Sequence, residues 1–203
     1  MNKVHSEDGI TLVETLVATL LIAIVTTSFY TVMFSATGGS EKSRDITRVS
    51  EEARSGLNRL IRDTREADSI ASVAGNSYNV KIDFNGDGAH ENPNALGDFE
   101  DLTFSYDSAT KTIRLNNEVL VAGVEKVAGR PVFSYSSNFL EYDWDGDGVT
   151  TLAELEDAGA HGVTSIATGT EESYLSGVAF EFQVQSGDST TEFYGEAQLR
   201  NRR

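Results

Sequence analysis

Cysteine is absent from the 203-residue chain, and proline and basic residues are scarce. Without Cys the protein forms no disulfide framework, no thiolate metal site and no Cys nucleophile. Only two Pro accompany eighteen Gly, so we expect most turns to be made by Gly, Asn and Asp. Sixteen Lys and Arg stand against thirty-two Asp and Glu, a formal net charge of −16. This balance argues against nucleic-acid binding, which needs clustered basic charge.

Motifs of the common enzyme classes are missing as well. The sequence contains no Gly-x-Ser-x-Gly, no His-Glu-x-x-His and no phosphate-binding Walker loop. Its three His are His5, near the start, and His90 and His161, both in polar contexts typical of loops. We therefore expect no enzyme. The hydrophobic content of 39%, with ten Phe and seven Tyr, is too high for a disordered acidic chain and predicts a folded domain.

Residues 10–34 form one apolar run, ITLVETLVATLLIAIVTTSFYTVMF, whose single charge is Glu14. At about 1.5 Å per residue, a helix of this length spans about 37 Å, enough to cross a bilayer. The helix of a soluble core is rarely apolar on all sides over such a length. A secretory signal peptide has a basic start and a small-residue cleavage site after a shorter apolar core. Here the polar residues 1–9 end in Gly9 before the run, so we expect the helix to be retained in the membrane.

Glu14 has two interpretations. Its carboxylate lies only five residues into the apolar run, so it can extend to the membrane interface. Alternatively it requires a positive partner, because an unpaired carboxylate in lipid is costly. A newly freed α-amino group would supply that partner.

The order Gly9, Ile10, Thr11, Leu12, Val13, Glu14, followed by the apolar run, resembles the signature of type IV prepilins. In that family a leader ends in Gly before a hydrophobic residue, and Glu is the fifth residue after the cut. The resemblance implies cleavage by a prepilin peptidase between Gly9 and Ile10 and N-methylation of Ile10. It implies that Glu14 neutralises the N-terminus of a neighbouring subunit during filament assembly. The acidic pair Glu7-Asp8 departs from the leaders of this family, which are usually basic.

The same resemblance implies partners and a location. The partners are other pilins or pseudopilins in a filament, the prepilin peptidase, an inner-membrane assembly platform and the membrane itself, with no nucleic acid. The protein is expected in the cytoplasmic (inner) membrane as a single-pass protein with its head outside the cytoplasm. It then passes into a pilus or a periplasmic pseudopilus.

An amphipathic helical stretch is predicted over about residues 40–70. Gly38-Gly39 interrupts the pattern after the apolar run, and Ser40 is a candidate N-cap. Apolar residues then recur at steps of three and four, which is the pattern of a helix with one buried face. They are Ile46, Val49, Ala53, Leu57, Leu60, Ile61, Ala67 and Ala71. A coiled-coil dimer is the alternative, but the stripe drifts from a strict heptad and strands follow that offer a sheet to cover.

The remainder predicts an antiparallel sheet and an α+β fold. Short alternating runs are expected to form strands. They are 78–83, 102–106, 112–115, 118–121, 132–135, 178–184 and 192–199.

With the resemblance, this order implies a pilin fold, a long N-terminal helix packed on an antiparallel head. The segments are a leader (1–9), a transmembrane and assembly helix (10–34), the amphipathic half (35–70) and an acidic β-rich head (71–203). Head segments such as LTFSYDSATKTIRLNNEVLVAGVEKVAGRPVFSYSSN and AQLRNRR also look like a minor pilin or a J-type minor pseudopilin of type II secretion.

The head contains a twelve-residue pattern typical of a calcium loop, DWDGDGVTTLAE. Asp143, Asp145 and Asp147 occupy positions 1, 3 and 5, and Gly148 permits the turn at position 6. The other predicted ligands are the Val149 carbonyl, a water held by Thr151 and a bidentate Glu154. The alternative is an acidic Gly turn without an ion. Because carboxylates confined to so short a segment repel one another, we favour a bound Ca2+ over an empty turn. We favour Ca2+ over Mg2+ because Mg2+ demands a smaller octahedral cage.

A candidate second calcium site begins in the same way. Asp83, Asn85 and Asp87 fall at positions 1, 3 and 5, but no Glu follows at position 12. Glu91 at position 9, or a carboxylate remote in sequence, could compensate. A plain Asn-Gly turn explains the segment nearly as well.

Two functions follow from these features. The first is a structural minor subunit of a type IV pilus or type II secretion filament, with a calcium-stabilised head. The alternative is a membrane-tethered, calcium-dependent binding or adhesion module.

Overall fold

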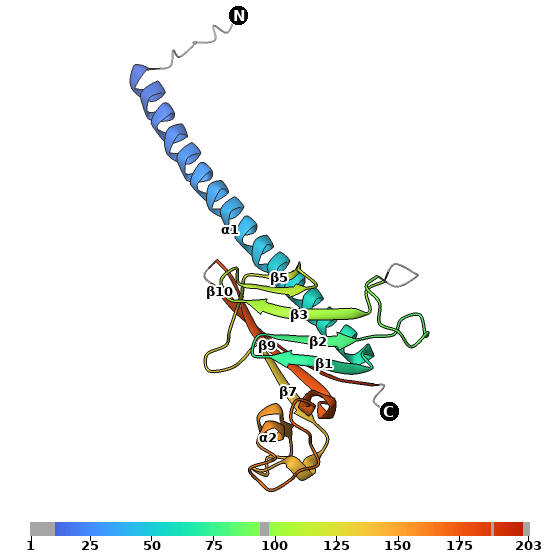
Figure 1. The fold of residues 1–203 in the computed structure, drawn as a ribbon. Helices are drawn as coiled ribbons and strands as arrows, with labels where there is room; N and C mark the ends of the chain where they lie inside the picture. Colours follow the sequence, from blue (N-terminus) through green and yellow to red (C-terminus); the bar gives the residue numbers. More distant parts are fainter. Residues whose placement is uncertain (1–10, 94–97, 188, 201–203) are drawn as a thin grey trace, which may run out of the picture. The chain divides into compact units, whose positions relative to one another are not determined.

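The computed structural model describes residues 11–93, 98–187 and 189–200, without the side chains of residues 36, 37 and 39–42. It confirms the α+β class, because one N-terminal helix is followed by antiparallel strands (Figure 1). The chain divides into two compact units, Met1–Asp45 and Ile46–Arg203. Helix α1 (Leu12–Glu66) contributes to both.

The first part of α1 carries the predicted membrane-spanning segment. Leu12–Ser35 is long and apolar enough to cross a bilayer, and none of it is buried within the protein. Six hydroxyl side chains donate hydrogen bonds to backbone carbonyls four residues earlier, over 2.8–3.1 Å. They are Thr15, Thr19, Thr26, Thr27, Ser28 and Thr31. Their polar groups are thereby satisfied inside the helix, as a lipid environment requires.

The Ser40 N-cap suggested by the residues alone was wrong, whereas the single long helix that the resemblance implied is present. Helix α1 continues through Gly38 and Gly39 and ends at Glu66, four residues before the predicted end. Two glycines cost about 2 kcal/mol in a helix interior, but propagation in an already formed helix needs no new nucleus. The predicted buried stripe is confirmed by Ala53, Leu57 and Leu60, all of which are buried.

A strand missed in the sequence follows α1. Strand β1 (Ser69–Ala74) pairs with β2 (Ser77–Lys81) across a tight turn, so Ala71 belongs to a strand and not to the helical stripe. Strand β1 opens an antiparallel sheet of order β1-β2-β3-β4-β5. Its other strands are β3 (Asp101–Asp107), β4 (Thr112–Leu115) and β5 (Glu118–Ala122).

The remaining strands form a second antiparallel sheet of order β10-β9-β7-β8, with β6 also paired to β9. Its long hairpin consists of β9 (Gly177–Ser186) and β10 (Ser189–Gln198), paired residue for residue. The others are β6 (Val124–Glu125), β7 (Phe133–Ser137) and β8 (Thr150–Thr151). Among the residues described, short helices lie between strands at η1 (Leu140–Tyr142), α2 (Leu152–Glu156) and η2 (Glu171–Tyr174).

Aromatic side chains join the two sheets. The ring of Tyr78 on β2 stacks on Phe104 with centroids 5.0 Å apart and meets Phe133 of the second sheet edge-on at 5.2 Å. The buried Tyr78 hydroxyl hydrogen-bonds Thr64 of α1 over 2.8 Å. The Tyr135 hydroxyl of β7 donates to the Ser77 carbonyl over 3.1 Å. The head is therefore one packed core, from which the acidic loops project.

Candidate metal centre

Three aspartates gather in the connection between η1 and β8. Asp143, Asp145 and Asp147 each place a carboxylate oxygen within 4.8 Å of the others. Asp143 is half-buried, and the other two are exposed. Three negative charges at this spacing repel one another, and a bound cation would remove that repulsion.

Backbone N–H groups fix the shape of this loop. The Asp143 carboxylate accepts hydrogen bonds from the amides of Gly146 and Gly148, both over 2.8 Å. Gly146 and Gly148 adopt positive φ angles of 77° and 89°, which glycine reaches without a steric penalty. Val149, predicted to offer its carbonyl, donates its N–H to Asp147 Oδ1 over 2.8 Å. The alternation of Asp and Gly thus folds the loop around its acidic side chains.

Glu154 closes the loop from the start of α2. Thr151 is the N-cap of this helix and forms a reciprocal capping box with Glu154. Glu154 Oε2 accepts the Thr151 N–H over 2.7 Å, and Oε1 accepts the Trp144 N–H over 2.9 Å. These bonds, with the Thr151 backbone N–H contributing most, lower the pKa of Glu154. An ionised Glu154 therefore joins positions 2 and 9 of the loop. In the part of the chain that the structure describes, the carboxylates that lie within 4.8 Å of one another are those of the three aspartates, without Glu154.

The second loop has the same internal hydrogen bonds. The Asp83 carboxylate accepts the N–H groups of Gly86 and Gly88, over 2.6 and 2.9 Å. Asp87 donates its N–H to Asn85 Oδ1 over 2.9 Å, as Asp147 does to Asp145 over 3.0 Å. The φ angles of Gly86 and Gly88 are 77° and 81°. Positions 1 to 6 of the two loops are therefore built alike.

Glu100 takes the place of the missing closing glutamate. Its Oε1 accepts the N–H of Phe84, position 2, over 3.1 Å, and its Oε2 accepts the N–H of Glu91, position 9, over 3.2 Å. These are the two loop positions that Glu154 joins in the first loop. Glu100 directly precedes β3 and is fully buried.

The sequence analysis did not identify Glu100, although it allowed for a remote carboxylate. It offered Glu91 at position 9, which the structure places in the exposed part of the loop. There the Glu91 backbone pairs with Glu100, because the Glu91 carbonyl also accepts the Glu100 N–H over 3.1 Å. The signal that could have found Glu100 is an acidic residue at the start of the next strand.

The chemistry of both donor sets fits calcium. All the candidate ligands are carboxylate, amide, hydroxyl and carbonyl oxygens, which hard divalent cations prefer. Flexible loops that offer a bidentate glutamate suit the 6–8 oxygens of Ca2+ better than the small octahedron of Mg2+. The sole tryptophan, Trp144, lies inside the first loop, and its ring stacks on His161 with centroids 4.4 Å apart.

The predicted processing residues belong to the other unit. Gly9 and Ile10 lie outside the described residues. Glu14 is in the first turn of α1 with an exposed side chain, and its N–H donates to Thr11 Oγ1 over 3.3 Å.

The chain was compared with protein-family models, curated proteins and solved structures, and it matches none of them. What the protein does therefore has to be inferred from α1 and from the two loops.

Proposed function

We propose that the protein is a filament subunit of the type IV pilin class, a minor pilin or a J-type minor pseudopilin of type II secretion. One observation carries this proposal. The apolar, unburied half of α1 runs without a break into a half that is buried against antiparallel strands, and it follows Gly9, Ile10 and Glu14 in the chain. This combination suits a protein that is first anchored in a membrane and later held in a polymer by the same helix.

In this proposal a prepilin peptidase cuts between Gly9 and Ile10 and methylates the Ile10 amine. The subunit waits in the cytoplasmic membrane with its head outside the cytoplasm. The Glu14 carboxylate then pairs with the Ile10 amine of a neighbouring subunit, which removes the cost of an unpaired charge in an apolar environment. Extraction by the assembly platform places the subunit in the pilus or periplasmic pseudopilus.

Calcium belongs to the same proposal. Ca2+ is held in the first loop by Asp143, Asp145, Asp147, Val149, Thr151 and Glu154. A second Ca2+ is held by Asp83, Asn85, Asp87 and Glu100. What supports this is the oxygen-only donor set and the matching hydrogen bonds of Glu154 and Glu100. The ions stabilise a head that carries most of the negative charge of the chain.

Processing and assembly are tested together in the full chain. Intact-mass measurement should show the loss of residues 1–9 and the gain of one methyl group. Glu14→Ala should be processed normally yet be missing from filaments sheared off the cells. Thr15→Ala is the matched control, because its hydroxyl bonds only within its own helix, and it should enter filaments. Equal incorporation of Glu14→Ala, or a chain that still carries Met1, would overturn the proposal. A protein found only as a membrane monomer would favour the tethered binding module instead.

A further inference from the structure

The two closing glutamates differ in what holds their own backbone. In the first loop Thr151, at position 9, caps helix α2, and its Oγ1 accepts the Glu154 N–H over 3.3 Å. The cap thereby fixes Glu154 in the first turn of the helix. Glu100 instead directly precedes strand β3, where helix capping does not apply. The second loop therefore needs a different group to hold its closing glutamate.

Asn92, at position 10 of the second loop, is that group. Its side-chain Oδ1 accepts the N–H of Glu100 over 2.9 Å and the N–H of Asp101 over 3.0 Å. Its Nδ2 donates to the Asp101 carbonyl over 2.8 Å. An amide side chain has an oxygen with two lone pairs and two N–H donors, so Asn92 pairs with Asp101 as a peptide group of a neighbouring strand would. These bonds fix the backbone at the point where β3 begins.

The other polar groups of Glu100 also bond to the two ends of the loop. The Glu100 carbonyl accepts the Ile82 N–H over 2.8 Å, and the Glu100 N–H is shared between Asn92 and the Glu91 carbonyl. The Glu100 carboxylate accepts the N–H groups of Phe84 and Glu91. A buried carboxylate is costly unless its oxygens are hydrogen-bonded or paired with a cation, and Glu100 is fully buried. A small displacement of the Glu100 backbone would therefore break contacts that the buried side chain needs.

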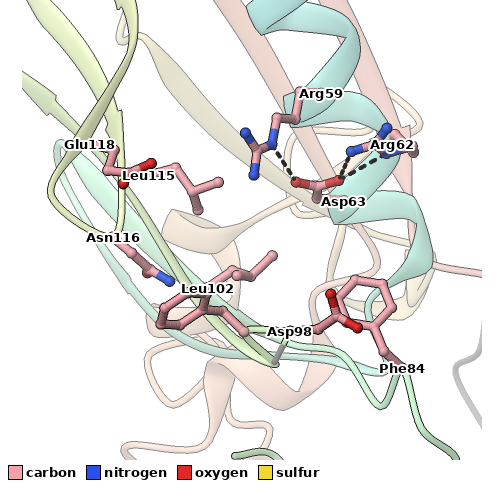
Figure 2. Close-up of a pocket in the computed structure, with 10 residues that line it drawn as sticks. Arg59, Arg62, Asp63, Phe84, Asp98, Leu102, Leu115, Asn116 and Glu118 are labelled. Atoms are coloured by element: carbon pink, nitrogen blue, oxygen red, sulfur yellow. Dashed lines mark hydrogen bonds and ion pairs between the residues drawn. The ribbon is translucent and has the colours of Figure 1, made fainter. Parts of the chain in front are cut away.

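The Phe84 N–H reports where Glu100 lies. Phe84 occupies position 2 of the loop, and its N–H donates to Glu100 Oε1 over 3.1 Å. The Phe84 side chain is 44% exposed and lines a pocket beside the end of α1 (Figure 2). Packing of the ring therefore holds this residue only in part. The Phe84 amide depends on the Glu100 carboxylate, and it can be followed in the absence of any metal.

We infer that Asn92 is the positioning residue of the second loop. By holding the Glu100 backbone, the Asn92 side chain sets the Glu100 carboxylate for Ca2+, while its own oxygen is engaged with the amides of Glu100 and Asp101. Asn92 does for Glu100 what Thr151 Oγ1 does for Glu154, one position later in its loop. The inference rests on the proposed function in one respect, that the second loop binds Ca2+.

A calcium titration of the full, detergent-solubilised chain by calorimetry tests the inference. Asn92→Ala should weaken binding of the second ion by about 10–100-fold, the loss usual for groups that orient a metal ligand. The first ion, followed by Trp144 fluorescence, should bind as before. Asn116→Ala is the matched control, because Asn116 also bonds the start of β3. Its side chain accepts the Thr103 N–H over 2.7 Å and donates to the Asp101 carbonyl over 3.2 Å, and neither bond reaches the closing glutamate.

Asn116→Ala should bind both ions with unchanged affinity. Equal losses in the two alanine variants would overturn the inference, because Asn92 would then act only through the general stability of β3. Asn92→Asp keeps an oxygen that accepts the Glu100 N–H and loses the donor to the Asp101 carbonyl, so it should retain the second ion. If Asn92→Asp lost the second ion as completely as Asn92→Ala, the inference would be contradicted.

Hydrogen exchange of single backbone amides, measured by NMR in chelator, gives a readout without metal. The Phe84 N–H should exchange about tenfold faster in Asn92→Ala, the change expected when one hydrogen bond is weakened. The Gly86 N–H, which donates to Asp83, should exchange at its original rate. An unchanged Phe84 rate would show that Asn92 does not position Glu100.

The failure of this inference differs from that of the proposed function. If Asn92→Ala and the unchanged chain both bind two ions equally well, the positioning role is wrong and the second calcium site stands. If the unchanged chain binds one ion, the second calcium site of the proposed function fails, and the inference falls with it.

Discussion

Glu154 and Glu100 accept the same pair of backbone hydrogen bonds, each in its own loop, although they stand at different places relative to those loops in the sequence. Each joins position 2 of its loop to position 9 through two backbone N–H groups. Glu154 does so from within the loop and is half-buried, whereas Glu100 arrives from the start of β3 and is fully buried. In each loop, backbone amides thus fix the position of the carboxylate that we propose as a calcium ligand.

Calcium binding to the first loop can be followed by the fluorescence of Trp144, which lies within it. Glu154→Gln removes one charge and the bidentate carboxylate, so calcium affinity should fall at least about tenfold, by comparison with losses of about 10–100-fold for indirect partners of a metal. Trp144 donates its indole N–H to the Glu154 carbonyl over 2.8 Å, and its fluorescence during a calcium titration is the measurement. Glu156→Gln, two residues further along α2, is the control and should bind as the unchanged chain does. Equal affinity of the two variants would remove Glu154 from the ligand set.

The second loop can be tested by the number of calcium ions that the chain binds. Calorimetry on the full chain should find two calcium ions per chain. Glu100→Gln should reduce this number to one without changing the Trp144 response. Glu91→Gln should leave both ions bound, because the contacts of Glu91 in this loop are made by its backbone. Loss of the second ion in Glu91→Gln, with retention in Glu100→Gln, would reverse the assignment.

The two loops also show what can be predicted at the scale of single residues. The local fold of residues at positions 1, 3 and 5 could be expected in both loops because a short Asp-Gly repeat determines its own backbone. Their role as calcium ligands stays a prediction. Glu100 was missed because its position depends on how the chain returns to β3, and no local pattern encodes that return. Clusters such as Arg59, Arg62 and Asp63 with Phe84 and Phe99 are likewise brought together only by folding.

At the scale of elements, the packing of helix α1 against the two sheets depends on two glycines that let the backbones come close together. A Cβ at Gly56 would overlap the Val121 side chain of β5 and lie 3.2 Å from the Leu120 carbonyl oxygen. A Cβ at Gly195 of β10 would likewise meet Leu57 and Ile61 of α1. The helix therefore needs glycine at both contacts to lie against both sheets.

The close contact at Gly56 predicts that a side chain added there lowers the stability of the head. Gly56→Val should destabilise the head by about 1–3 kcal/mol, because an overpacked contact forces helix and strand apart. Gly75→Ala is the matched control, since nothing lies within 4 Å of its added Cβ, and exposed substitutions of this kind change stability by less than about 0.5 kcal/mol. Urea unfolding of the full chain in detergent, followed by circular dichroism, measures both. An unchanged midpoint for Gly56→Val would show that the contact relaxes without cost.

Elements with a clear hydrophobic repeat were predicted more accurately than the residues at which elements begin and end, or the strands with which they pair. The buried stripe through Ala53, Leu57 and Leu60 was predicted because one helix face generates its own spacing. The helix start suggested at Ser40 was wrong because local propensity is weaker than the cooperativity of a long helix. The division into two sheets was not foreseen, since pairings such as β6 with β9 join residues far apart in sequence.

At the scale of the whole molecule, residues 71–203 carry −14 of the formal net charge of −16, and this charge destabilises the head by self-repulsion. Two agents relieve this repulsion differently. Monovalent salt screens exposed charges at long range, with a Debye length of about 8 Å at physiological ionic strength. Calcium bound in the two loops, as proposed, would instead neutralise their carboxylates at contact. The two effects should therefore be separable in one experiment.

We expect calcium to raise the unfolding temperature of the head in the full, detergent-solubilised chain. At a free calcium concentration of about 100 times Kd, one site contributes about 2.7 kcal/mol, and 1 kcal/mol corresponds to about 2–4 °C for a domain of this size. Each occupied loop should thus add about 5–11 °C, and Mg2+ should add less. In chelator, sodium chloride alone should give a smaller rise, because it acts only by screening. The double variant Glu100→Gln and Glu154→Gln should lose the calcium increment and keep the salt increment. If the double variant gained as much from calcium as the unchanged chain, the stabilisation would come from general charge neutralisation, and the two loops would be turns without a bound ion.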